Sequence, residues 1–149
     1  MEDLENSPGF QLWRASNAWQ RVLRRLLDPM GLTHTQFIVL AIADRLGKVK
    51  PCVTQAMIHE VAELDENLTS QVVRSLQAKG LVERRPHPED GRAVSLMLTA
   101  EGKRLIEEGR TTLTEAKDRF FAPVQDRKED LANILRTLAD GADEKVAQN

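Results

Sequence analysis

The chain has 149 residues, which is enough for one domain with a hydrophobic core and too few for two independent domains. Only 4% of the residues are aromatic and none is Tyr, which favours packed helices over a β-sandwich or barrel. The formal net charge of −2 excludes a chain that is basic throughout. Residues 67–99 are the positive part, with five basic against three acidic side chains, a net of +2.

The same sequence features predict a cytoplasmic protein that does not contact a membrane. The longest apolar run, Phe37 to Ala43, has seven residues and is too short to cross a bilayer. The acidic start, Met1 to Asn6, lacks the charged-then-apolar order of a signal peptide. The single cysteine, Cys52, excludes an internal disulfide, as expected in a reducing compartment.

The first predicted helix begins at Ser7-Pro8, where Ser suits the N-cap and Pro the first helical position. Pro29 and Gly31 end it. Apolar residues follow one helical stripe, but Phe10, Trp13 and Leu27 lie off it. Either these three side chains contact a partner subunit or they all belong to the core of their own domain.

Two further helices precede the positively charged stretch. Thr33 and Gln36 match a capping box, and the helix behind them, about Thr35 to Leu46, is apolar nearly all round and should form the centre of the core. Gly47 is expected to close it, and residues 48–53 to form a loop or a short strand beside a hairpin. Thr54 then caps a short helix that runs to about Glu63.

An amphipathic helix is predicted between Asp65, which suits the N-cap, and Gly80, which suits the left-handed residue that ends a helix. Leu68, Val72 and Leu76 recur every four residues as an apolar stripe. The opposite face carries short polar groups and a guanidinium: Asn67, Ser70, Gln71 and Arg74. Such groups pair bidentately with adenine and guanine edges, so this face either reads DNA or is an ordinary solvated face. Thr69 and Ser75 flank it and could contact phosphates.

A β-hairpin follows, with strands at Val82–Pro86 and Ala93–Leu98. Arg84 and Arg85 should point to opposite faces of a strand, so we expect one of them, preferably Arg84, to face DNA. Arg92 lies in the turn, where Asp90 can pair with it and shape the turn while the guanidinium reaches a phosphate or the minor groove.

Two helices complete the predicted fold. Thr99 caps a long one that runs to about Phe121, in which Gly109 marks a close helix crossing or a bend. Pro123 ends this run, and Asp126 with Glu129 starts a last helix that ends near Gly141. The tail from Ala142 to Asn149 should fray.

The stretch from Asp65 to Leu105 resembles the recognition helix and wing of MarR-type winged helix-turn-helix regulators. The resemblance rests on Leu76-x-x-x-Gly80-Leu81-Val82, Asp90-x-Arg92 and Leu98-Thr99-x-x-Gly102, and upstream on Gly31-Leu32-Thr33 with "TQFIVL". His59 and Glu63 depart from the family pattern, which has a small residue and Gly there. The turn could therefore be less sharp, or the helix before it could run on.

The resemblance implies a mainly α fold with a small β-hairpin wing. It implies a single domain over residues 1–149, with a DNA-binding lobe at 33–98 and dimerisation helices at 7–30 and 99–141. It also implies a homodimer on a pseudo-palindromic operator in double-stranded DNA, usually repressing transcription, with Arg92 as a wing contact. Family members often bind a small aromatic effector in a crevice, which Trp13 and Trp19 could line, although tryptophan in packed helices more often belongs to the core.

Other classes of function find less support in the sequence. There is no nucleophile elbow, metal motif or glycine-rich phosphate loop, so we expect neither an enzyme nor a cofactor. The three histidines lie on separate predicted elements, which argues against a metal site. Cys52 has only Lys50 as a nearby cation, so an inert thiol is favoured over a redox sensor. The alternative to a DNA-binding regulator is a winged-helix module that binds protein and leaves the polar helix face unused.

Overall fold

The computed structural model describes the backbone of residues 3–146 and the side chains of residues 3–142. It is mainly helical with one two-stranded antiparallel sheet, which confirms the predicted fold class. The chain divides into two compact units, Met1–Leu113 and Thr114–Asn149.

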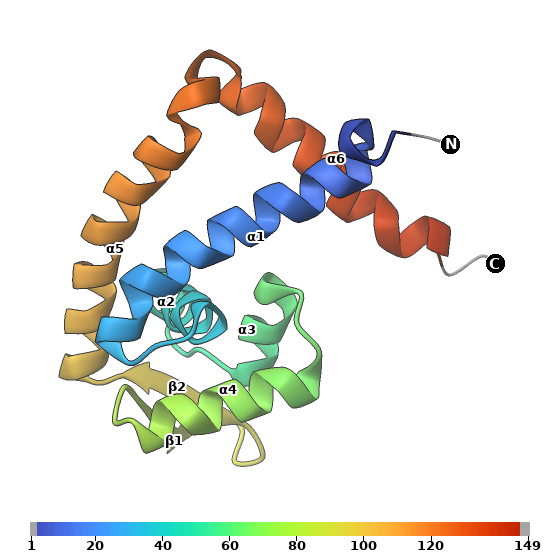
Figure 1. Cartoon of the computed structure of the whole chain (residues 1–149). Coiled ribbons are helices and arrows are strands. Elements are labelled where there is room, and N and C mark those ends of the chain that lie inside the picture. Colours follow the sequence, from blue (N-terminus) through green and yellow to red (C-terminus); the bar gives the residue numbers. More distant parts are fainter. Residues whose placement is uncertain (1–2, 147–149) are drawn as a thin grey trace. The chain divides into compact units, whose positions relative to one another are not determined.

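The first unit begins with a 3₁₀ turn at Leu4–Asn6 and contains four helices before the hairpin. These are α1 (Pro8–Leu27), α2 (His34–Val49), α3 (Gln55–Ala62) and α4 (Glu66–Ala78), with a second 3₁₀ turn at Asp28–Met30. The hairpin is β1 (Val82–Pro86) with β2 (Val94–Leu98), and α5 (Ala100–Phe121) starts directly after it. Helix α2 contacts α1, α3, α4 and β2, and lies at the centre of this unit (Figure 1).

The predicted starts of α2, α3 and α5 are confirmed by hydrogen bonds at their caps. Thr33 Oγ1 accepts from Gln36 N at 3.2 Å, and Gln36 Oε1 accepts from Thr33 N at 3.0 Å, which completes the capping box. Thr54 Oγ1 accepts from the Met57 amide at 3.3 Å and Thr99 Oγ1 from the Gly102 amide at 3.1 Å. Ser7 occupies the N-cap of α1 before Pro8, but its side chain makes no capping bond.

Two predicted helix ends are wrong, and both were placed at a glycine. Helix α2 continues through Gly47 to Val49, and Lys50 N donates to Leu46 O at 2.8 Å. The last helix continues through Gly141 to Val146, so its end was placed too early; of the predicted frayed tail, residues 147–149 lie outside the described residues. A glycine inside a helix costs only about 1 kcal/mol relative to Ala, so continued hydrogen bonding can outweigh it.

The core of the first unit surrounds α2. Phe37, Val39, Leu40 and Ala43 are all at most 5% exposed. Ile38, however, is 38% exposed, so the prediction that α2 is buried on every side is too broad. Leu23 and Leu27 of α1 join the same core, which places Leu27 with its own unit rather than with a partner.

The hairpin pairs in the register Val82↔Leu98, Arg84↔Leu96 and Pro86↔Val94. The segment before α3 joins it through one bridge, Thr54↔Ser95, and Leu96 N donates to Val53 O at 2.8 Å. The predicted loop or short strand beside the hairpin is therefore a loop with a single strand-like bridge.

Helix α5 approaches the rest of the first unit closely at two glycines. A Cβ built on Gly109 would lie 2.3 Å from Cε2 of the Phe37 ring, so Gly109 marks a close crossing with α2. A Cβ on Gly102 would lie 2.1 Å from the carbonyl oxygen of Leu81. Real Cβ atoms essentially never come within 3.0 Å of such neighbours, so a side chain at Gly102 would have to displace backbone, and one at Gly109 would have to displace the Phe37 ring.

The second unit contains the last turns of α5, a 3₁₀ segment at Ala122–Arg127 and α6 (Lys128–Val146). The break before Pro123 is confirmed, whereas α6 starts two residues later than predicted. None of the described side chains from residue 114 onward is buried, and α6 exposes Ile134, Leu135 and Leu138 by 55%, 39% and 56%. Among the described residues, no single helix is long and apolar enough to cross a membrane, and only the bent pair α1 and α2 taken together meets that test.

Candidate nucleic-acid interface

Helix α4 begins and ends at the residues that its sequence predicts. The Asp65 carboxylate accepts from the Leu68 amide at 2.8 Å, so part of the negative charge before the helix serves as its N-cap. Gly80 takes φ 71°, the left-handed conformation that favours glycine, and Leu81 N donates to Leu76 O at 3.0 Å.

The two sides of α4 differ sharply in exposure. The inward side is formed by four residues that are at most 8% exposed: Thr69, Val72, Val73 and Leu76. Asn67, Gln71 and Arg74 are exposed, and Ser70 is half-buried beside them. The predicted reading face is thus free of the core and presents amide and guanidinium groups to the solvent.

The structure corrects two details of this helix. Leu68, predicted to belong to the apolar stripe, is 37% exposed. Thr69, predicted to flank the reading face, is 0% exposed, and its hydroxyl donates to Asp65 O at 2.9 Å. Thr69 therefore belongs to the core, and we remove it from the candidate DNA contacts because its hydroxyl cannot reach a phosphate from there.

Arg74 is held along the polar face by Ser70. Its Nη2 lies 3.3 Å from Ser70 Oγ and its Nε 3.4 Å from Ser70 O. These contacts are long and exposed, so the guanidinium can exchange them for a base or a phosphate at little cost.

Ser75 is attached to the core helix instead of standing free. Gln36 Nε2 donates to Ser75 Oγ at 2.8 Å, across 39 positions of sequence. Lys79 Nζ donates to Gln36 Oε1 at 3.0 Å and also to Gly31 O. The capping glutamine of α2 thus ties the carboxyl-terminal half of α4 to the core, a role for Gln36 and Lys79 that sequence reasoning missed because no local pattern signals it.

The turn between α3 and α4 contains both departures from the family pattern. Glu63 takes φ 51°, and it is the one non-glycine residue with positive φ in the described part of the chain. Helix α3 ends at Ala62, so the expectation of a less sharp turn or a longer helix is wrong. Nδ1 of His59 lies 2.6 Å from Leu64 O, and this hydrogen bond holds the turn while Glu63 adopts the conformation that glycine would take more cheaply.

The wing arginines lie on opposite faces of β1, as predicted. Arg84 pairs with Leu96 in the register, and its Nη2 lies 3.5 Å from Oε1 of Gln55, the first residue of α3. Arg85 pairs with Ser95 instead and forms an exposed ion pair with Glu83 at 3.1 Å. Arg84 is thus the arginine that lies beside the helix-turn-helix, which supports its preference as the DNA contact.

At the tip of the wing, Asp90 shapes the turn through the backbone. Its carboxylate accepts from the Arg92 amide at 3.0 Å, and His87 Nδ1 accepts from the amides of Glu89 and Asp90, each at 3.1 Å. No ion pair or hydrogen bond of the Arg92 guanidinium occurs among the described residues. The predicted pairing of the two side chains is therefore replaced by a backbone bond, and the exposed guanidinium remains available.

The two tryptophans proposed for an effector crevice lie in different surroundings. Trp13 is 61% exposed and stacks on Phe10 with ring centroids 5.8 Å apart. Trp19 is half-buried and packs against the core. Six residues apart on one helix, they point about 120° apart, so they do not form one wall.

No cluster of three or more histidine, cysteine or acidic side chains is placed to hold a metal ion in the part of the chain that the structure describes. Lys48, Lys50, Arg85 and Lys103 border one cavity in the first unit, a grouping that the sequence analysis did not identify.

Comparisons with known proteins agree with this geometry. A family model described as MarR family matches residues 30–93. The HTH-type transcriptional regulator YdcH of Bacillus subtilis, itself uncharacterised, is 32% identical over 132 residues, which are 89% of this chain and 90% of that protein. The family-model match includes the whole of α4, β1 and the turn of the hairpin, and it ends directly before β2.

Two solved structures have the same fold over nearly their whole length. The transcriptional repressor CouR bound to a 23-mer DNA duplex has a TM-score of 0.82 at 26% identity, covering 93% of this chain and 96% of that one. The PcaV regulator of Streptomyces coelicolor in complex with its natural ligand has a TM-score of 0.79 at 28% identity, covering 95% and 98%. The chain therefore belongs to the MarR family of winged helix-turn-helix transcriptional regulators.

Proposed function

We propose that this protein is a dimeric, sequence-specific DNA-binding regulator, a repressor released by a small-molecule effector. The observation that carries the proposal is the exposed polar face of α4, whose opposite side is buried and which lies next to a wing with three exposed arginines, Arg84, Arg85 and Arg92. Its relatives are transcriptional regulators, not enzymes, and CouR binds a DNA duplex. We place the protein in the cytoplasm, because relatives such as YdcH come from bacteria, whose chromosome lies there.

On DNA, α4 enters the major groove and the wing lies alongside it. Asn67 and Gln71 have amides suited to adenine, and Arg74 has a guanidinium suited to guanine or to a phosphate. Ser70 lies beside them, and Ser75 is a weaker candidate because Gln36 already occupies its hydroxyl. Arg84 and Arg92 neutralise phosphates or reach the minor groove from the wing.

The proposed assembly has a DNA-binding lobe at 33–98, with dimerisation helices at 7–30 and 99–141. Ile134, Leu135 and Leu138 offer α6 an exposed apolar stripe, and Leu12 and Trp13 do the same near the start of α1. Isologous pairing of two chains buries such surfaces and gives the two-fold symmetry that a pseudo-palindromic operator mirrors. Half-sites are then about one helical turn, roughly 10 bp, apart.

Release by an effector is supported by PcaV, whose structure holds its natural ligand. Trp13 and Trp19 remain sequence predictions for the crevice that takes an aromatic effector. An effector that weakens operator binding must itself bind less tightly to the DNA complex by the same factor.

A gel-shift of the full-length protein against its own upstream DNA, titrated with salt, tests the function. We expect a tight complex on one segment, weaker binding to unrelated DNA, and a fall in affinity with rising salt from counterion release. Equal affinity for all sequences would remove the claim of specificity. Absence of any complex at low salt would favour the alternative, a winged-helix module that binds protein.

A further inference from the structure

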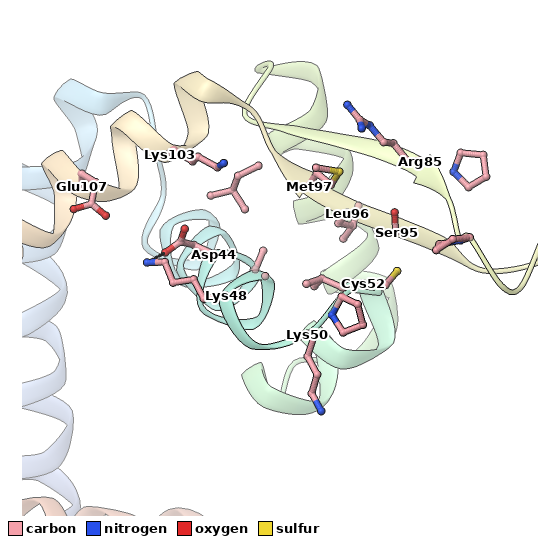
Figure 2. Close-up of a pocket in the computed structure, with 17 residues that line it drawn as sticks. Asp44, Lys48, Lys50, Cys52, Arg85, Ser95, Leu96, Met97, Lys103 and Glu107 are labelled. Atoms are coloured by element: carbon pink, nitrogen blue, oxygen red, sulfur yellow. Dashed lines mark ion pairs between the residues drawn. The ribbon is translucent and has the colours of Figure 1, made fainter.

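A cavity of about 660 Å³ lies between the end of α2, the hairpin and the start of α5, wholly within the first unit (Figure 2). Its volume falls in the range of small-molecule sites, roughly 300–1,000 Å³. It contains neither Trp13 nor Trp19 and none of the residues on the polar face of α4. It is therefore separate from the residues that the sequence assigns to DNA or to an effector.

The two carboxylates at this cavity are already neutralised. Asp44 lies 2.9 Å from Lys48 Nζ and 2.6 Å from Arg110 Nη2, and Glu107 lies 3.1 Å from Arg110 Nη1. Burial alone would raise the pKa of Asp44, but the hydrogen bonds and charges of Lys48 and Arg110 outweigh it and hold the pKa below its ordinary value. Asp44 is thus a fixed anion with its own cations, and a cationic ligand finds no free partner there.

The remaining charge around the cavity is positive. The side-chain amines of Lys50 and Lys103 have no hydrogen bond or ion pair with any described residue, and the Arg85 guanidinium has only its exposed contact with Glu83. In Figure 2, Lys103 on α5 directs its amine toward the hairpin, whereas Lys50 extends away from the other lining side chains. Lys103 is consequently the free cation best placed to meet an anion inside the cavity.

Apolar side chains supply the rest of the binding surface. Leu96, Met97 and Leu98 of β2 line the cavity together with Val53, from the segment before α3. Met97 is 46% exposed, so a ligand that covers it gains hydrophobic burial. Cys52 is half-exposed and also lines the cavity, with its thiol directed toward β2 in Figure 2.

The cavity also borders the link between the wing and the helix-turn-helix. Leu96 N donates to Val53 O at 2.8 Å and Thr54 bridges to Ser95, while the cavity is lined by Val53, Ser95 and Leu96 themselves. A molecule inserted there presses on the backbone that fixes the hairpin relative to α3.

We propose that this cavity binds a small organic monoanion, with its anionic group on Lys103 and its apolar body against β2, and that occupancy shifts the wing and so changes operator affinity. The second half rests on the DNA-binding function proposed above. The first half concerns binding to the free protein and stands without it.

The test uses Cys52, the single cysteine of the chain, as a reporter in the free full-length protein. Iodoacetamide, which is uncharged, alkylates the thiol, and mass spectrometry follows the rate. We expect millimolar 2-naphthoate to slow alkylation, and its uncharged analogue 2-naphthamide to protect far less at equal concentration. No protection by naphthoate, or equal protection by both compounds, would overturn the proposed site.

A matched pair of variants locates the anion. Lys103→Gln should raise the naphthoate concentration for half-protection about tenfold, since a hydrogen bond to a charged group is lost. Lys117→Gln removes the same charge from an exposed position on the same helix, outside the cavity. This variant should leave the naphthoate concentration for half-protection unchanged. Equal behaviour of the two variants would overturn the role of Lys103.

Operator affinity with and without 2-naphthoate tests the coupling. We expect naphthoate to change the operator affinity of the wild type. In Lys103→Gln the same change should require about tenfold more naphthoate, when each protein is compared with itself in the absence of the compound. Protection of Cys52 with unchanged operator affinity would overturn the regulatory half alone. A protein that binds no DNA would refute the proposed function, while the alkylation assay would still decide the cavity.

Discussion

The first and the second unit differ in how far their apolar side chains are buried. In the first, α2 is surrounded by helices and by β2, and side chains such as Leu40, Ile58 and Leu76 are completely buried. In the second, no described side chain is buried, and α6 exposes Ile134, Leu135 and Leu138. One unit thus has a core of its own, whereas the other has an apolar stripe that needs another surface to cover it. The first unit thus holds its fold together through its own buried side chains, and we propose that the exposed stripe of the second unit pairs with another chain.

The largest expected effect comes from charging that stripe. Leu135→Glu combined with Leu138→Glu should leave the first unit folded but abolish dimers, and operator affinity should fall about a hundredfold because the two half-sites no longer act together. Sedimentation and a gel-shift measure the two results. Asn133→Glu, on the same helix but off the stripe, is the control. A dimer that survives the double substitution would show that α6 is not the interface.

A pair of glycine substitutions compares packing in the two units directly. Gly102→Ala places a Cβ against the carbonyl oxygen of Leu81, which Thr99 N already holds at 3.0 Å, so we expect a loss of about 2–3 kcal/mol in stability. Gly141→Ala in α6 meets nothing within 4 Å and should be neutral or stabilise by up to about 1 kcal/mol. Urea unfolding measures both. Equal effects would mean that α5 does not pack as closely against Leu81, the residue before β1, as the structure shows.

The ion pairs of the two units should also differ in their contribution to the free energy of unfolding. The carboxylate of Asp44 is 11% exposed between Lys48 and Arg110, so Asp44→Asn should cost about 1–3 kcal/mol at neutral pH. Because the folded-state pKa of Asp44 is lowered, its contribution is present above the ordinary value of 3.8 and is lost as the pH falls through the folded-state pKa. The free energies of unfolding of wild type and Asp44→Asn should therefore converge in acid.

The control for Asp44 lies in the second unit. Asp118 forms an exposed pair with Lys128 at 3.5 Å, so Asp118→Asn should change stability by less than about 0.5 kcal/mol. Urea unfolding at several pH values would follow all three proteins. A difference in stability between wild type and Asp44→Asn that persists or widens in acid would show that folding does not lower the pKa of Asp44.

The smallest effect on the fold is expected at the wing tip. Arg92→Ala removes an exposed guanidinium with no partner among the described residues, so stability and dimerisation should not change. Affinity should fall on all DNA sequences, and each lost phosphate contact should reduce the salt slope by about 0.9. A thermal melt with a salt titration of binding checks this. Loss of dimer would show that the wing has a structural role.

The sequence predicted the helix starts well because capping is local. Each of four capping side chains accepts from the backbone amide three residues ahead, a spacing that can be read directly from the sequence: Thr33, Thr54, Asp65 and Thr99. The ends at Gly47 and Gly141 failed because a glycine permits a helix to end but does not require it.

The candidate site was predicted only as far as local periodicity extends. The polar face of α4 was identified from its spacing. Thr69, however, is buried in the core while Leu68 lies at the surface, because a threonine methyl packs well once its hydroxyl bonds to Asp65 O. Two side-chain pairs join residues that are far apart in the sequence: Gln36 and Ser75 by 39 positions, Asp44 and Arg110 by 66. No periodic pattern connects the members of either pair. The cavity at the hairpin depends on such distant pairs and so could not be foreseen.

The most direct test of the account is a binding matrix of operator variants at two salt concentrations for the wild type, Gln71→Ala, Arg74→Ala and Arg92→Ala. We predict that Gln71→Ala loses about 1–3 kcal/mol on the preferred site and relaxes preference at one position per half-site. Arg92→Ala should weaken binding to all DNA sequences equally. Arg74→Ala should behave like Gln71→Ala if Arg74 contacts a base, and like Arg92→Ala if it contacts a phosphate. Unchanged sequence preference in both helix variants would show that α4 does not read the operator, and unchanged affinity in all three would contradict DNA binding itself.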